Sequence, residues 1–136
     1  MRAGGRCEYC RLPQSAYKRR FHLEHIVARC HGGTEDLANL ALACASCNLR
    51  KSVNLAGIDP LTGEVAALFH PRKDAWADHF EIRLVRQRGP LEICGKTPQG
   101  RATVHTLRMN SESTQLARTE LWREGSLGEE INGESF

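Results

Sequence analysis

The segment NLALACASCNLRK, residues 39–51, contains a CxxC pair of cysteines, and CEYC, residues 7–10, supplies a second pair. The chain has six cysteines in 136 residues. Cysteines placed at random at that frequency give only about 0.26 CxxC spacings. Two neighbouring thiolates on a tight turn bind one face of a Zn²⁺, and a second pair completes its tetrahedron. The spacing therefore predicts one structural zinc site with four ligands: Cys7, Cys10, Cys44 and Cys47.

Other interpretations of the cysteines explain less of the pattern. A disulfide framework is not expected, because Met1–Gly5 leads into polar sequence rather than into the apolar core of a secretory signal. One CxxC could be a redox dithiol, but that needs a strand before it and a helix after it, and it leaves the other pair unexplained. Cys30 and Cys94 belong to neither CxxC pair, and we predict that both are small buried apolar side chains.

Between the cysteine pairs, FHLEHIVARCHGG, residues 21–33, places a carboxylate beside a histidine. Together with two asparagines, this set could hydrolyse a phosphodiester. The reaction needs a hard divalent cation, and Glu24 with the side-chain carbonyl of Asn48 offers the oxygen ligands that Mg²⁺ or Mn²⁺ prefers. It also needs a base that is neutral near pH 7, as His25 can be, held in one tautomer by an asparagine carbonyl.

Each of these residues also has a purely structural interpretation. His25 alone would be an ordinary surface or core histidine, and Asn39 could be a turn residue that caps the next segment. Asn48 could cap the start of a helix, a role that conflicts with metal binding because one carbonyl would serve both. Glu24 could form an ion pair at the surface, where such pairs contribute little.

These strings resemble the HNH endonuclease family, with its ββα-metal core, in the subgroup framed by two CxxC pairs. The resemblance covers residues 7–51. It implies that His25 activates water, that Asn39 orients His25, and that Glu24 and Asn48 bind the catalytic Mg²⁺ or Mn²⁺. It further implies a metal-dependent DNA endonuclease that leaves a 5′-phosphate, with Zn²⁺ in a purely structural role.

The sequence departs from the family pattern in two places. Val27-Ala28-Arg29 stands where the family often has a proline, which affects the shape of the turn more than the chemistry. Glu24 replaces the more usual Asp and retains the oxygen ligand. Because adjacent residues of a regular strand face opposite sides, Glu24 and His25 can act on one phosphate only if the strand ends or bulges there. We predict such an irregularity.

Basic and polar residues near this set are candidates for contact with nucleic acid. Lys51 lies one helical turn after Asn48, and we predict that it contacts phosphate, with further contacts from Arg50, Arg29 and His22. Alternatively, Lys51, Arg50 and Arg29 could simply form a basic surface exposed to solvent. His22 could also touch the metal, or be a partly buried structural residue.

The charge distribution agrees with a polyanionic partner. Residues 1–111 hold 17 Lys and Arg against 10 Asp and Glu, whereas residues 112–136 hold 2 against 6. No apolar run approaches the roughly 18 residues of a membrane span. We therefore expect a cytoplasmic protein that is not embedded in a membrane and that binds DNA. The rival hypothesis is a non-catalytic zinc-binding module that binds nucleic acid or a protein partner.

The overall pattern predicts an α+β protein with a zinc-stabilised ββα-metal core and a small C-terminal extension of a hairpin and helices. Residues 1–57 would form the core, with strands near 21–27 and 37–44 and a helix over 45–55. Residues 58–123 would add a strand at 64–69, a hairpin over 81–94, and helices over 98–109 and 113–122. This extension leaves room for a specificity or dimerisation element, so a homodimer stays open. Residues 124–136 would be a disordered acidic tail.

Overall fold

The protein's structure is a computed structural model, which describes residues 2–87 and 89–125. Within those residues, six short strands form three two-stranded antiparallel sheets, accompanied by four α-helices and three short 3-10 helices. The sheets pair β1 (His22–His25) with β2 (Leu40–Ala43), β3 (Ala56–Ile58) with β4 (Val65–Ala67), and β5 (Phe80–Leu84) with β6 (Leu91–Gly95). The α-helices are α1 (Ala45–Lys51), α2 (Trp76–His79), α3 (Pro98–Leu107) and α4 (Glu112–Arg123), and the 3-10 helices are η1 (Gln14–Ala16), η2 (Arg29–His31) and η3 (Leu37–Asn39). The predicted α+β class is confirmed.

The β1–β2 hairpin followed by α1 forms the predicted ββα unit. Its register is regular from His22 opposite Ala43 to His25 opposite Leu40. At Val27 the backbone N–H donates to the side chain of Asn39 instead of to a strand carbonyl, so the backbone pairing stops. β1 therefore ends at His25, two residues before the predicted end, and the irregularity expected beside Glu24 is this strand end.

Helix α1 is shorter than predicted. It ends at Lys51 because Ser52 adopts a φ of 50°, a left-handed conformation that a helix cannot continue through. Its N-cap is Cys44, whose sulfur accepts the backbone N–H of Cys47. Asn48 lies inside the helix, so the alternative in which Asn48 caps the helix is wrong.

The C-terminal part follows the predicted order with two additions. Thr97 caps α3 by accepting the N–H of Gly100, and Pro98 is its first residue, as predicted. α3 ends at Leu107 because Arg108 is left-handed, while α4 agrees with its prediction to within one residue at each end. Strand β3 and the short helix α2 were not predicted.

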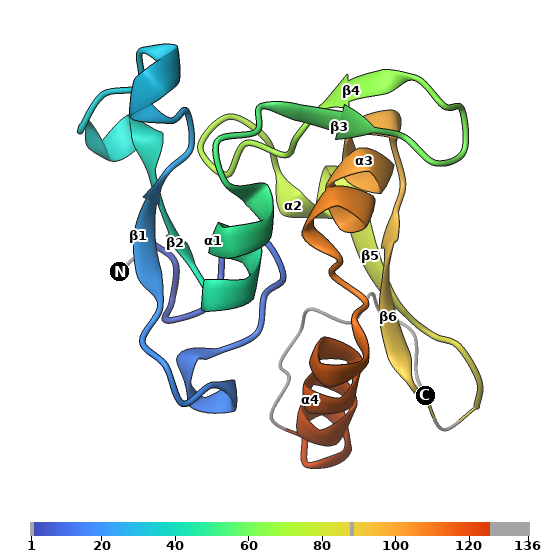
Figure 1. The fold of residues 1–136 in the computed structure, drawn as a ribbon. Coiled ribbons are helices and arrows are strands. Elements are labelled where there is room, and N and C mark those ends of the chain that lie inside the picture. The colour runs from blue at the N-terminus through green and yellow to red at the C-terminus, as the bar shows by residue number, and fades with distance from the viewer. Residues whose placement is uncertain (1, 88, 126–136) are drawn as a thin grey trace.

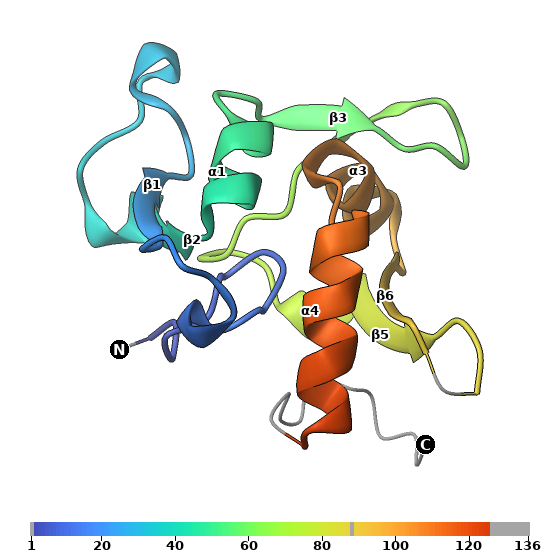
Figure 2. The same cartoon turned by 60° about the horizontal axis from the view of Figure 1, so that its bottom comes forward.

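The two parts of the chain pack side by side. Figures 1 and 2 show β1, β2 and α1 on one side, α3 with the β5–β6 hairpin on the other, and α4 next to the N-terminal segment. The indole N–H of Trp76 donates to the carbonyl of Tyr9 at 2.8 Å, and the Tyr9 and Phe69 rings meet edge to face. The buried core thus includes residues from before and after position 57.

Two expectations lie at the limits of the described residues. The predicted disordered tail, residues 124–136, falls outside them from position 126 onward. None of the helices in the described part of the chain has the length and apolar content that crossing a bilayer requires.

Candidate functional site

The four cysteines of the two CxxC pairs come together as predicted. Their sulfur atoms all lie within 4.8 Å of one another, and all four residues are buried. Cys7 and Cys10 come from the N-terminal loop, whereas Cys44 and Cys47 come from the start of α1. Burial raises the pKa of Cys7 well above its ordinary value, while hydrogen bonds from the neighbouring thiols lower the pKa of Cys44. Four thiolates in so small a buried space need a cation to compensate their charge.

The surroundings of this cluster fit a zinc ion bound by four thiolates, which carries a net negative charge. Arg118 of α4 is fully buried, and its electrostatic neighbours include Cys10 and Cys47. Its Nη2 donates to the carbonyl of Met109 at 3.0 Å, whereas Nε and Nη1 have no hydrogen-bond partner among the described residues. A buried guanidinium that interacts electrostatically with two of the four cysteines can offset part of the negative charge of such a site. The cluster therefore has both the donor set and the environment of a structural zinc site.

Glu24 lies on β1 and is only 5% exposed. The hydroxyl of Tyr9 donates to its Oε1, and the ammonium of Lys51 lies 3.3 Å from its Oε2. Burial raises the pKa of the Glu24 carboxyl, and the contacts with Tyr9 and Lys51 partly offset that rise. Each carboxylate oxygen of Glu24 therefore has one partner in the buried interior. The sequence motif gave no indication that Tyr9 is one of these two partners.

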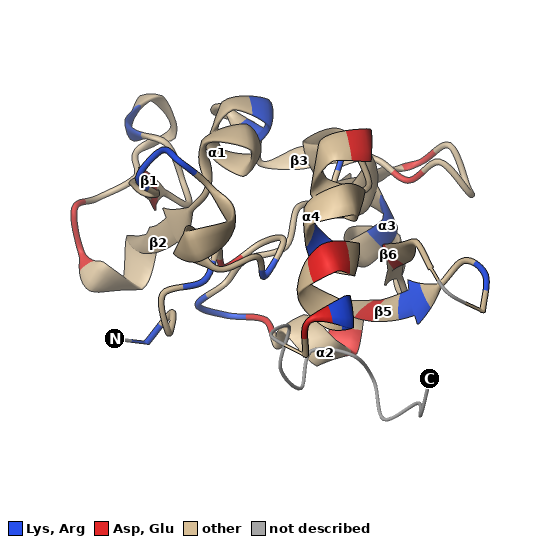
Figure 3. Cartoon of the chain, turned by 90° about the horizontal axis from the view of Figure 1, so that it is seen from below, with Lys and Arg blue, Asp and Glu red and all other residues tan. Residues whose placement is uncertain are grey.

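Lys51 is not presented at the surface, as a phosphate contact was predicted to require, because its side chain is only 2% exposed. Its ammonium donates to the carbonyl of Ile26 at 2.8 Å and lies beside Glu24, so it joins the end of α1 to the end of β1. Arg50 is half-buried, and its Nη1 donates to the carbonyls of Leu107 and Arg108 at the end of α3. Figure 3 shows other Lys and Arg on the segment that leads into β1.

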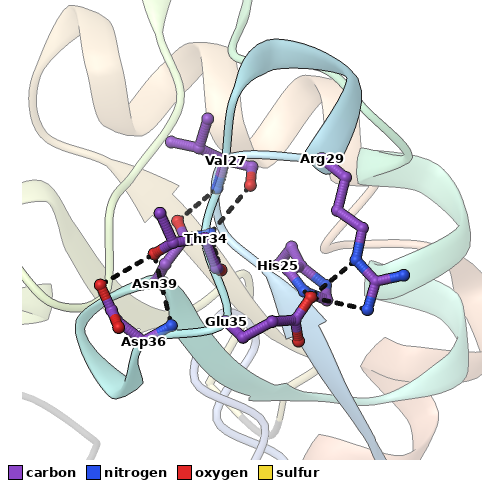
Figure 4. Close-up of polar contacts among 7 residues, drawn as sticks. All are labelled: His25, Val27, Arg29, Thr34, Glu35, Asp36 and Asn39. Carbon is purple, nitrogen blue, oxygen red and sulfur yellow. Dashed lines mark hydrogen bonds and ion pairs between the residues drawn. The ribbon is translucent and has the colours of Figure 1, made fainter.

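His25 takes part in a polar cluster that the sequence did not reveal (Figure 4). Its Nε2 lies 2.8 Å from Oε1 of Glu35, and the same oxygen accepts from Nε of Arg29 at 2.7 Å. These two hydrogen bonds lower the pKa of Glu35 below its usual value. The only signal for Glu35 in the sequence is its place after Gly-Gly-Thr in the connection from β1 to β2.

Asn39 does not bond to His25, which corrects the predicted contact. Its Oδ1 accepts the backbone N–H of Val27 at 2.9 Å, and its Nδ2 donates to the carbonyls of Val27 and Thr34 at 2.9 and 2.8 Å (Figure 4). A side chain at Gly33 would collide with the carbonyl of Val27, so glycine permits this close approach. Asn39 thus joins the two ends of the connection that carries Glu35.

A surface cavity of about 410 Å³ brings four of the predicted site residues together. Glu24, His25 and Asn48 all line it, with Arg29 at the same cavity. The remaining lining residues are Leu23, Ala28, Cys30, Ser52 and Val53. Asn39 and His22 do not line this cavity, although His22 is exposed on β1.

The two cysteines outside the zinc cluster are not the buried apolar side chains that we predicted. Cys30 is exposed and lines the cavity, because η2 carries it on the surface connection after β1. Cys94 of β6 is half-buried, and burial raises its pKa to about 11.

Comparison with known proteins agrees with this geometry. Residues 7–54 match the family model described as HNH endonuclease. Neither a comparison with curated proteins nor one with solved structures gave a match. The matched segment contains both cysteine pairs, the β1–β2 hairpin and all of α1. The ββα unit with its four-cysteine cluster is therefore similar to the HNH endonuclease family over residues 7–54.

Proposed function

We propose that this protein is a metal-dependent endonuclease that hydrolyses phosphodiester bonds in DNA. The observation that carries the proposal is the cavity shared by Glu24, His25 and Asn48 within the matched HNH segment. A carboxylate, an imidazole and an amide from two elements are the groups that metal-assisted phosphodiester hydrolysis needs. The basic excess of residues 1–111 favours a polyanionic substrate.

In this proposal His25 is the general base. It is half-buried at the end of β1 and lines the cavity, so a water molecule there can reach its ring. His25 takes a proton from that water, and the resulting hydroxide attacks phosphorus in line with the leaving 3′ oxygen. The products are a 3′-hydroxyl and a 5′-phosphate. Positioning and charge stabilisation supply most of the rate in such reactions.

Glu24 and Asn48 would hold the divalent cation. A carboxylate and a side-chain carbonyl are hard oxygen donors, which suit Mg²⁺ or Mn²⁺, and the remaining positions would go to water and phosphate. When bound, such a cation polarises the phosphate and takes up charge that develops on the leaving oxygen. Arg29, 72% exposed in its side chain, is the cation at the cavity best placed to contact the DNA backbone, with Arg50 and His22 as further proposed contacts.

A plasmid-nicking assay with added Mg²⁺ or Mn²⁺ tests the proposal. The wild type should convert supercoiled plasmid to open circles, and His25→Ala should be slower by at least about 100-fold. His105→Ala, which changes an exposed histidine of α3, is the matched control and should nick like the wild type. Zinc content should be equal in all three proteins. Equal nicking by His25→Ala would overturn the role of His25.

One observation favours the rival, a non-catalytic zinc module that binds nucleic acid or a protein. The Lys51 ammonium already compensates the charge of the Glu24 carboxylate, and the Tyr9 hydroxyl donates a hydrogen bond to it. A carboxylate with both partners does not need a metal cation. If this rival is correct, the wild type would bind DNA but would not nick it with Mg²⁺ or Mn²⁺. Any background nicking would be the same for the wild type and for His25→Ala.

A further inference from the structure

Among the described residues, Glu35 is the carboxylate whose side chain lies within hydrogen-bond distance of the His25 ring, and neither the family motif nor the proposed chemistry uses it. We propose that Glu35 is a positioning residue that holds His25 with its hydrogen on Nε2, so that Nδ1 is the nitrogen that accepts the proton from water. The proposal rests on the proposed nuclease function and deepens it, because it names the residue that orients the base.

The contact itself decides where the hydrogen lies. Nε2 of His25 and Oε1 of Glu35 are 2.8 Å apart, which is a hydrogen-bond distance. An ionised carboxylate only accepts hydrogen bonds, so the imidazole nitrogen that faces it must carry a hydrogen. A neutral imidazole has one N–H and one acceptor, and its acceptor is then Nδ1.

Glu35 has the charge state that this role requires. Hydrogen bonds from His25 and Arg29 lower its pKa below the usual value, so it is ionised at neutral pH. Its side chain is 63% exposed, and ion pairs at such positions contribute little to stability. The contact with His25 therefore serves orientation rather than folding.

An exposed glutamate can orient another side chain only if its backbone is fixed, and here it is. The carbonyl of Thr34, just before Glu35, accepts from Asn39 at 2.8 Å. The backbone N–H of Asp36, just after it, donates to the hydroxyl of Thr34 at 3.3 Å. Asn39 also bonds to Val27, two residues beyond His25. The same asparagine thus links the backbone near the base to the backbone that carries its carboxylate partner (Figure 4).

Arg29 completes the arrangement. Its Nε donates a hydrogen bond to Oε1 of Glu35 at 2.7 Å, and its Nη2 lies 2.6 Å from the same oxygen. The arginine limits the positions that this flexible carboxylate can take beside the ring.

The test reads the hydrogen position directly, on the zinc-loaded full chain with ¹⁵N-labelled histidine. NMR of the ring nitrogens, with His25 assigned from its absence in His25→Ala, should show the Nε2–H form in the wild type. Glu35→Ala should give a mixture of the two tautomers. Glu35→Gln keeps an acceptor oxygen and should restore the Nε2–H form. Glu64→Ala, at an exposed glutamate in the turn before β4, is the control and should leave His25 unchanged.

Nicking rates give the second readout. Glu35→Ala should lower kcat about 10- to 100-fold with little change in KM, and Glu35→Gln should recover most of the loss. The proposal is overturned if the His25 tautomer is the same in wild type and Glu35→Ala, or if Glu35→Ala loses the tautomer and still nicks at the wild-type rate. A wild type that shows the Nε2–H form but nicks no DNA overturns the nuclease function instead, and the catalytic meaning of Glu35 falls with it.

Discussion

Lys51 and Glu24 form a buried ion pair whose two members come from different elements, the end of α1 and the end of β1. A lysine one turn beyond Asn48 is a reasonable phosphate ligand when only the sequence is known. The fold turns this position inward, where the ammonium also bonds to the carbonyl of Ile26. Its distance along the chain from both partners is why a local pattern could not reveal the contact.

Replacing Lys51 by methionine should therefore destabilise the protein. Lys51→Met keeps the apolar part of the side chain but leaves the Glu24 carboxylate buried without its cation. Breaking one side of a buried pair costs about 3 kcal/mol of unfolding free energy. Chemical denaturation of the zinc-loaded protein measures this change, and Lys18→Met, at an exposed lysine, should stay within about 0.5 kcal/mol of the wild type. A phosphate-binding lysine would instead show unchanged stability and a weaker salt dependence of DNA binding.

At the scale of elements, the connection from β1 to β2 supplies one wall of the cavity, with Ala28, Arg29 and Cys30. It runs from Ile26 to Asn39 and has no strand partner, so the amide of Asn39 supplies the hydrogen bonds that a sheet would otherwise give. The motif drew attention to Asn39, but for a contact with His25 that the side chain does not make. Its partners could not be read from the sequence, because they are backbone groups brought near by the turn at Gly32 and Gly33.

Asn39→Asp tests this account of the connection. The change keeps the shape of the side chain but removes both N–H donors and puts a negative charge beside the carbonyls of Val27 and Thr34. The connection should open, and the amide of Val27 should exchange its hydrogen with solvent faster than in the wild type. Zinc content should not change. Asn54→Asp, at an exposed asparagine after α1, is the control. Unchanged exchange at Val27 would contradict the proposed role of Asn39.

Elements that are fixed by neighbouring residues could be predicted, whereas elements that depend on partners far away in the sequence could not. The hairpin of β5 and β6 and helices α3 and α4 follow from local turn and capping signals such as Gly89-Pro90 and Thr97-Pro98. Strand β3 exists because it pairs with β4, and its Gly57 lies against Thr106 of α3. The four-residue helix α2 is too short to form alone, and it is stabilised by burial of Trp76 in the core.

For the molecule as a whole, the packing of α3 against α1, the bond from Trp76 to Tyr9 and the interaction of Arg118 with Cys10 and Cys47 join the two parts of the chain. The four ligands could be predicted from spacing because metal geometry requires pairs of nearby thiolates. Arg118 could not, since it lies 71 positions after the last cysteine of the cluster, Cys47. The expected boundary at residue 57, the homodimer and the cytoplasmic location remain predictions.

Arg118→Met should weaken zinc retention. Methionine fills much of the same space but removes the positive charge that interacts with Cys10 and Cys47 and the unpartnered donors at Nε and Nη1. Zinc should pass several-fold faster to a chromogenic chelator, and Arg118→Lys, which restores the charge, should lie between the two. Arg86→Met changes an exposed arginine and should match the wild type. Identical release from Arg118→Met and wild type would show that Arg118 does not stabilise the zinc site.

The central claim is that one zinc supports the fold while a second, hard cation acts at Glu24 and Asn48. It is tested most directly by titrating Mg²⁺ into protein that carries one zinc per chain and no other metal, with plasmid nicking as the readout. We expect no nicking with zinc alone and saturable nicking with Mg²⁺. Glu24→Gln and Asn48→Ala should need more Mg²⁺ while keeping their zinc. Full nicking with one zinc and no second cation, or an unchanged Mg²⁺ requirement in both variants, would contradict it.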